Sequence, residues 1–135
     1  MYFAVIDTNV IVSALLKHIS IPGKILDYIT ANVIVPVASF EILDEYTDVL
    51  NRSKFPFTEE EVHNTICLLR EKSIIINADK CDLPFTDLED AKFYEIAFET
   101  NKNYGGYLVT GNIKHFPIEP FIIKPREMTE IIEKQ

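Results

Sequence analysis

The sequence predicts an α/β fold, a three-layer α/β/α sandwich around a mostly parallel sheet. Short, continuous apolar runs, which suit strands buried on both faces, alternate along the chain with longer segments of helical periodicity. Such alternation favours parallel strands joined by right-handed helical crossovers. Repeats and linker-like segments are absent, so the 135 residues, 47% of them hydrophobic, are expected to form one domain spanning 1–135 around one core.

Five apolar runs are interpreted as strands, at residues 2–6, 33–37, 74–76, 107–110 and 121–123. Six further segments are interpreted as helices, at residues 9–16, 22–31, 40–50, 59–72, 87–101 and from 125 onward. Their starts carry recognisable signals, which are the N-cap residue Ser39, the capping-box pair Thr58 and Glu61, and the first-turn prolines Pro22 and Pro125. A parallel sheet of this kind binds ligands at the carboxyl ends of its strands.

Composition limits the classes of function. The formal charge of −8 counts against a general nucleic-acid coat, which needs a basic field, but not against a nuclease whose carboxylates hold cations. Plain solubility is the commoner reason for such a charge. No apolar run approaches the roughly 20 residues of a membrane span, and no signal peptide is evident, so a cytoplasmic protein is expected. Cys67, interpreted as a core residue, and Cys81 lack the spacing of a zinc site.

Acidic and polar residues lie where the predicted strands end or where the neighbouring helices begin, at Asp7, Glu41, Asp44, Glu45, Asp87, Asp90 and Asn112. If these positions converge, their hard oxygen ligands suit Mg²⁺ or Mn²⁺. A cation there can polarise a phosphate, lower the pKa of a bound water and orient its attack. Because clustered carboxylates repel one another, at least one of them is expected to have a raised pKa without a cation.

Each of these acids also has a structural interpretation. Asp7 suits a helix N-cap as well as a metal ligand, and the local sequence leaves both open. Asp87 and Asp90 have capping-box spacing, which favours a cap role for Asp87. Glu41 and Glu45 share one helix face, and local physics does not decide which of them points inward.

The basic residues form no metal-binding pattern. His18 and His63 have no partner at ligand spacing, so a solvated or structural role is expected for both. Lys114 and His115 follow Asn112 near the predicted crevice and are candidates for contact with a phosphate. Further candidates for contact with a phosphate are Lys17, Lys24, Arg52 and Lys54. Charged side chains in helices and loops are, however, usually just solvated.

Four segments together resemble a PIN domain, and the likeness is closest to the branch that contains toxins of toxin-antitoxin pairs. The segments are residues 5–10 (VIDTNV), 41–50 (EILDEYTDVL), 87–91 (DLEDA) and 108–112 (LVTGN). The likeness covers nearly the whole chain. The order and spacing of the four segments make it far more specific than any one of them.

The resemblance implies a parallel-sheet α/β/α fold, dependence on Mg²⁺ or Mn²⁺, and cleavage of single-stranded or structured RNA. The family's acidic metal ligands correspond to Asp7, Glu45 and Asp90. Asn112 stands where many PIN domains carry a fourth acid, and its amide oxygen brings no charge, so metal affinity is expected to be lower. Polar residues that would orient ligands or water are Thr8, Asn9 and Thr110, joined by Asp87 if it is not a cap.

The resemblance also implies an antitoxin protein partner and a homodimer. A catalytically weakened PIN scaffold that acts as a binding module is the main alternative, motivated by Asn112 and the acidic total. A phosphatase or phosphoacceptor is a weaker alternative. The aspartate-based phosphatases need a second acid two residues after the nucleophile, where this chain has Asn9, and a receiver-type phosphoacceptor needs an acidic pair where only Asp7 is present.

Overall fold

A five-stranded sheet forms the centre of the computed structural model, which describes residues 1–80 and 88–134. The strand order is β3-β2-β1-β4-β5, and every neighbouring pair is parallel. The strands are β1 (Tyr2–Ile6), β2 (Ile34–Ala38), β3 (Ile74–Ile75), β4 (Tyr107–Val109) and β5 (Ile122–Ile123). All five predicted strands are present, and the predicted parallel sheet is confirmed.

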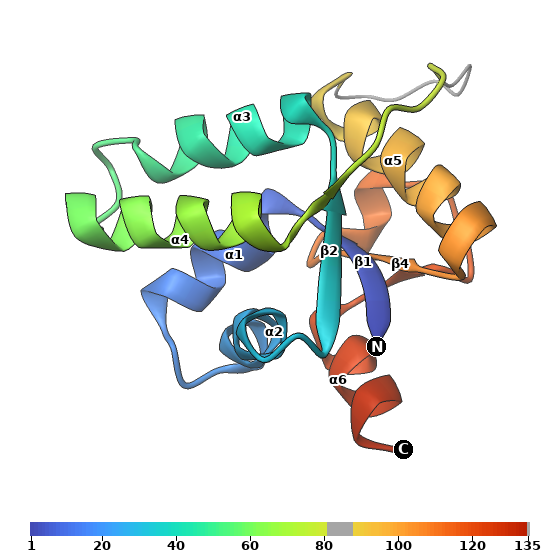
Figure 1. Cartoon of the computed structure of the whole chain (residues 1–135), viewed down its shortest axis with the longest axis horizontal. Helices are drawn as coiled ribbons and strands as arrows, with labels where there is room; N and C mark the ends of the chain where they lie inside the picture. Colours follow the sequence, from blue (N-terminus) through green and yellow to red (C-terminus); the bar gives the residue numbers. More distant parts are fainter. Residues whose placement is uncertain (81–87, 135) are drawn as a thin grey trace.

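The helices cover both faces of this sheet. They are α1 (Thr8–Leu16), α2 (Ile21–Thr30), α3 (Phe40–Leu50), α4 (Glu59–Lys72), α5 (Leu88–Tyr104) and α6 (Pro125–Glu133), with a short 3-10 turn η1 (Ile113–His115). Figure 1 shows α1 to α4 on one side of the strands and α5 on the other, and α6 packs against α2. The predicted three-layer α/β/α sandwich is therefore confirmed.

Side-chain caps fix the starts of the helices that flank the carboxyl edge of the sheet. Ser39 accepts a hydrogen bond from the backbone N–H of Ile42 at 3.2 Å, and Thr58 and Glu61 form the predicted reciprocal capping box. Asp7 occupies the N-cap position of α1, but its side chain makes no cap hydrogen bond. The carboxylate of Asp7 is therefore available for another role.

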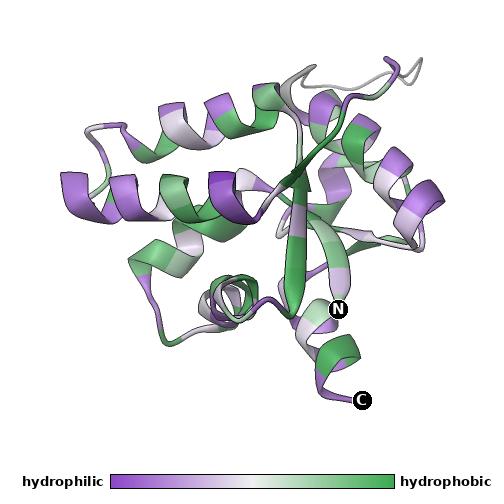
Figure 2. Cartoon of the chain, in the orientation of Figure 1, coloured by the Kyte–Doolittle hydropathy of each residue, from purple (hydrophilic) through white to green (hydrophobic). Residues whose placement is uncertain are grey.

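Apolar side chains from both faces of the sheet form one buried cluster. In Figure 2 the strand β2 is hydrophobic along almost its whole length, whereas hydrophilic residues collect on the helices around it. The prediction that Cys67 belongs to this core is wrong, because it lies on the exposed face of α4, with its Sγ 3.5 Å from Nε2 of His63. In the part of the chain that the structure describes, no helix is long and apolar enough to span a membrane.

The order of the strands creates a switch point beside β1. Chain connections lead from β1 to β2 on one side of it, while β4, distant in sequence, pairs on its other side. Ile6 is in register with Val109, and the backbone N–H of Asp7 donates to the carbonyl of Val109 at 3.0 Å. Asp7 directly follows β1, and Thr110 directly follows β4. The two residues are therefore neighbours at the edge where α/β sheets bind ligands.

Candidate functional site

A cavity of about 820 Å³ opens at this carboxyl edge of the sheet. The predicted site residues that line it are Asp7, Thr8, Asn9, Glu45, Asp90 and Asn112. They come from the end of β1, the start of α1, the middle of α3, the first turn of α5, and the turn after β4. Thr110 is fully buried beneath the lining, and Asp87 lies outside the described residues.

Asp7 is the most deeply buried acid of this lining, with only 6% of its surface exposed. The hydroxyl of Thr110 donates to its Oδ2 at 2.7 Å and in turn accepts from the backbone N–H of Asn112 at 3.0 Å. Burial raises the pKa of Asp7, the hydroxyl of Thr110 lowers it, and the nearby charge of Glu45 raises it further. The net pKa is above the ordinary value, so the ionised carboxylate lacks enough compensating charge.

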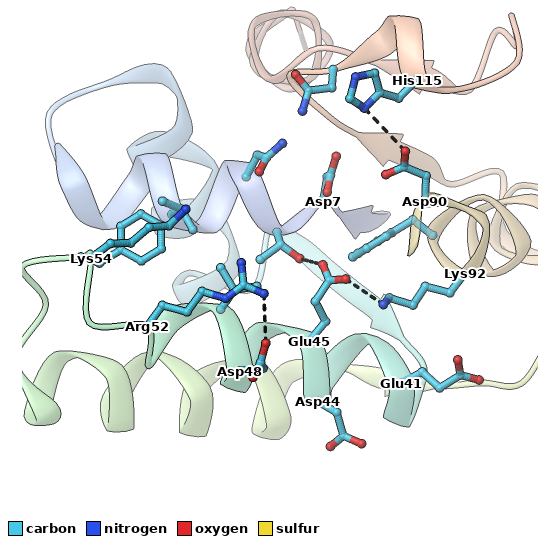
Figure 3. A pocket seen from close by; sticks show the side chains of 17 residues that line it. Asp7, Glu41, Asp44, Glu45, Asp48, Arg52, Lys54, Asp90, Lys92 and His115 are labelled. Atoms are coloured by element: carbon cyan, nitrogen blue, oxygen red, sulfur yellow. Dashed lines mark hydrogen bonds and ion pairs between the residues drawn. The ribbon is translucent and has the colours of Figure 1, made fainter. Parts of the chain in front are cut away.

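Glu45 is the glutamate of α3 that turns into the cavity. Its Oε1 lies 2.7 Å from Nζ of Lys92 on α5, and its Oε2 accepts a hydrogen bond from the hydroxyl of Thr8. Glu41 and Asp44 are exposed at the cavity margin, and Figure 3 shows the Asp44 carboxylate pointing away from that of Glu45. The structure thus answers the question that the shared face of Glu41 and Glu45 left open.

Asp90, in the first described turn of α5, faces the turn that follows β4. Its Oδ2 lies 3.5 Å from Nδ1 of His115, which is also part of the cavity lining (Figure 3). The expectation that His115 lies near the crevice is confirmed. Lys114 is exposed and is not among the described residues that line the cavity.

Two residues of this site, Lys92 and Tyr46, were not predicted from the sequence. Lys92 lies two positions after Asp90, and the sequence offered no signal that it reaches across to α3. Tyr46 directly follows Glu45 in the segment 41–50, and as an aromatic residue it suits the apolar core there as well as any polar role. Its buried hydroxyl donates to the carbonyl of Ile6, which ties α3 to the end of β1. Burial and the charges of Asp7 and Glu45 raise the pKa of Tyr46 well above its ordinary value, so its phenol is a neutral donor.

The chemistry of the donor atoms fits a hard divalent cation, which prefers carboxylate and amide oxygens. A cation would also offset the uncompensated charge of the buried Asp7 carboxylate. Among the residues that the structure describes, however, no three acidic, histidine or cysteine side chains are close enough together to hold a metal ion. Glu45 is instead drawn toward Lys92, and Asp90 toward His115.

The cavity also has a basic and aromatic part, contributed by the connection between α3 and α4. Arg52, Lys54 and Phe55 from this connection belong to the same lining as the acids. Lys24, by contrast, pairs with Glu133 at 3.4 Å outside the cavity, so it is excluded as a phosphate contact of this site.

Two comparisons with known proteins show what the chain is similar to. Residues 4–114 match the profile of a family described as PIN domain. An uncharacterized protein of Methanocaldococcus jannaschii, MJ1680, is 33% identical over 111 residues, a stretch that covers 80% of this chain and 69% of that protein. The matched region contains all the strand ends and helix starts that line the cavity.

Proposed function

The chain belongs to the PIN domain family, and on this premise we propose that it is an endoribonuclease that hydrolyses phosphodiester bonds in RNA. PIN domains are generally metal-dependent nucleases. The observation that carries the proposal is the convergence of Asp7, Glu45, Asp90 and Asn112, from four separate segments, on one cavity at the switch point of the sheet.

We assign Asp7, Glu45 and Asp90 as the ligands of Mg²⁺ or Mn²⁺, with the amide oxygen of Asn112 as a neutral acceptor beside them. A divalent cation held there offsets charge on the phosphate and supplies a nucleophilic water at neutral pH. The remaining polar residues of the site orient these side chains. Thr110 holds Asp7 by its hydroxyl, and Thr8 holds Glu45. Asn9 and Asp87 are proposed as further polar groups around the cation.

Lys92 gives the site a counter-ion before any metal binds. Its ammonium lies against Glu45, and both side chains are only 17% exposed, so the pair is largely shielded from water. Glu45 is thereby kept in the cavity rather than released to solvent. Once the carboxylates are neutralised, the same ammonium is placed to attract a phosphate oxygen.

The test compares cleavage of labelled RNA by the unmodified chain and by Asp7→Asn, Glu45→Gln and Asp90→Asn, each in Mn²⁺ and in EDTA. Asp44→Asn is the matched control, because it removes a carboxylate that neighbours Glu45 in sequence but is exposed. We expect cutting that needs the metal, survives in Asp44→Asn, and falls at least about 100-fold in the other three variants. Metal-dependent cutting that is equal in all variants would sink the assignment of these ligands.

A binding module built on a catalytically weakened PIN scaffold is the second candidate. The ion pair between Lys92 and Glu45, together with the neutral Asn112, favours it, because both lower the negative charge available to a cation. RNA that binds the unmodified chain but stays intact in Mg²⁺ and in Mn²⁺ is the outcome that supports this candidate over the nuclease.

We further propose that the chain acts as one domain, forms a homodimer, and is the toxin of a toxin-antitoxin pair with an antitoxin protein as partner. These proposals rest on the likeness of the segments at 5–10, 41–50, 87–91 and 108–112 to that branch of the family. Induced expression of the unmodified chain is expected to arrest growth, whereas expression of Asp7→Asn is not.

The homodimer is tested separately, by light scattering after gel filtration. A monomeric mass would contradict the proposed dimer.

A further inference from the structure

The lining of the cavity mixes acids and cations, with Lys92 against Glu45 and Arg52 against Asp48. Asp7 and Glu45 lie in the middle, and Figure 3 shows Arg52 and Lys54 on one side of them, with Asp90 and His115 on the other. A polyanion approaching so many carboxylates is repelled unless a cationic surface lies beside them. The two cations of the α3–α4 connection, residues 51–58, provide such a surface.

Phe55 is the aromatic member of this surface, and its ring is fixed in place. It stacks on Phe57, with 5.3 Å between the ring centroids and 15° between the planes. Its backbone N–H donates to the carbonyl of Arg52 at 3.2 Å, which closes the turn. Phe57 packs against the core, whereas Phe55 is not among the described apolar side chains that do so. Phe57 is thus the anchor, and Phe55 presents its ring at the cavity.

Arg52 and Lys54 hold only weak contacts on this surface. Arg52 pairs with Asp48 at 3.1 Å, but the two side chains are 51% and 72% exposed, and exposed pairs of this kind contribute little. Nζ of Lys54 lies 5.1 Å from the centroid of the Phe55 ring. A guanidinium and an ammonium in such contacts exchange them readily for a phosphate, which an arginine can bind through two parallel hydrogen bonds.

We infer that Arg52, Lys54 and Phe55 form a nucleotide subsite for single-stranded nucleic acid, with a base stacked on Phe55 and the adjoining phosphate bound by the two cations. This inference rests on the proposed nuclease function, whose cavity it shares. Stacking of a base on an aromatic ring is stronger than an exposed contact between an ammonium and the same ring, so the base replaces Lys54 and frees its charge for the phosphate. Bases paired in a duplex offer no free face, so the subsite selects single strands.

The test measures binding of a fluorescent oligoadenylate in EDTA, where no metal-dependent cleavage intervenes, and of the same strand annealed to its complement. We expect Phe55→Leu to weaken single-strand binding roughly tenfold, and Phe55→Tyr to bind like the unmodified chain. Arg52→Gln and Lys54→Gln should each lower the slope of log affinity against log salt by about 0.7. Duplex should bind more weakly than single strand, and Phe55→Leu should leave duplex binding unchanged.

Matched controls separate the subsite from general effects. Phe40→Leu makes the same change at a phenylalanine that is 67% exposed and outside the cavity lining, and Lys24→Gln removes an exposed, paired cation elsewhere. Both should bind like the unmodified chain. Thermal unfolding of every variant checks that the fold is intact, and rescue by Phe55→Tyr shows that the ring, rather than local packing, is what matters.

The outcomes distinguish this inference from the proposed function. If the unmodified chain cuts RNA in Mn²⁺ but Phe55→Leu binds the oligoadenylate equally well, the subsite is overturned and the nuclease stands. If binding depends on Phe55 but no metal supports cleavage, the nuclease fails and the subsite stands as a binding surface. Absence of single-strand binding by the unmodified chain also overturns the subsite, as expected if residues 52–55 contact a protein instead.

Discussion

Thr110 connects two segments of the site through one hydroxyl. It donates to Asp7 and accepts from the backbone of Asn112, so it orients the acid at the end of β1 and shapes the turn after β4 at once. Loss of a polar group that is hydrogen-bonded to a metal ligand commonly lowers metal affinity by roughly 10- to 100-fold, so Thr110 is expected to matter for the proposed cation site.

Replacing Thr110 by valine, which has nearly the same shape, removes this hydroxyl. The pKa of Asp7 should rise further, because the hydrogen bond that lowers it is lost. We expect Mn²⁺ affinity, measured by calorimetric titration, to fall by roughly 10- to 100-fold, and stability by about 1 kcal/mol. Thr110→Ser keeps the hydroxyl and should retain most of the affinity. Equal Mn²⁺ affinities of Thr110→Val and Thr110→Ser would mean that the hydroxyl does not influence metal binding through Asp7.

Lys92 competes with a cation for Glu45, whereas Thr110 supports the proposed cation site. The Lys92 ammonium already supplies positive charge to the Glu45 carboxylate. In Lys92→Met, Glu45 loses this partner while remaining largely shielded, so the metal-free protein should lose roughly 2 kcal/mol, less than a fully buried pair would. Mg²⁺ should restore part of the loss, as followed by urea unfolding with and without EDTA. Lys24→Met, at an exposed pair, should change little. An equal loss in both variants would show that Lys92 is no special partner of Glu45.

The acids of the site were predictable from the sequence, because apolar runs mark where the strands end. Asp7 directly follows such a run, and the parallel order carries it to the binding edge. The roles of Lys92 and Tyr46 could not be predicted, because they depend on contacts with other segments. Lys92 contacts Glu45 on α3, and Tyr46 donates to the carbonyl of Ile6. Such long-range contacts leave no spacing pattern in the sequence.

At the scale of the elements, α3 connects the site with the rest of the fold. Ser39 caps its start, Glu45 projects from its middle into the cavity, and Tyr46 ties it to β1. The neighbouring α4 has an equally well formed capping box at Thr58, but Thr58 is not part of the described cavity lining. The two caps therefore offer a comparison between stability and activity.

Ser39→Ala and Thr58→Ala should each lower the free energy of unfolding by about 1 kcal/mol, the usual cost of losing an N-cap. Only Ser39→Ala should also slow cleavage, because the first turns of α3 position Glu45. Thermal melts and initial cleavage rates measured in parallel test this. A matching loss of activity in Thr58→Ala would attribute both effects to general loosening of the fold.

Most helix starts were predictable because caps are local, whereas some boundaries were not. Helix α5 continues to Tyr104, beyond the predicted end near residue 101, and ends where Gly105 adopts a positive φ of 65°. The turn η1 was not predicted, since a three-residue turn has no periodicity. The start of α2 came earlier than Pro22 suggests, because Ser20 caps it by accepting from Gly23.

At the scale of the whole molecule, the raised pKa of Asp7 couples folding to pH and to metal. Because its folded pKa exceeds the unfolded value of 3.8, ionised Asp7 destabilises the fold. This penalty is fully present above the folded pKa and disappears as the pH falls to below 3.8. Asp7→Asn removes the charge at every pH.

In EDTA at neutral pH, Asp7→Asn should therefore be more stable than the unmodified chain, and the difference should shrink as the pH is lowered. Mg²⁺ should reverse the order, since it stabilises only the chain that binds it, by about 2.7 kcal/mol at a hundred times its Kd. Urea titrations followed by circular dichroism measure both effects. A lower stability of Asp7→Asn in EDTA at neutral pH would show that the carboxylate stabilises the fold even without a cation.

The buried phenol of Tyr46 has a spectroscopic consequence. The chain contains six tyrosines and no tryptophan, so tyrosine dominates its near-ultraviolet absorption. Burial and the charges of Asp7 and Glu45 raise the pKa of Tyr46, so we expect a cation bound between the two carboxylates to shift the absorption band of this phenol. An ultraviolet difference spectrum, with Tyr46→Phe as the reference, would then report binding of a cation at the site without label or substrate.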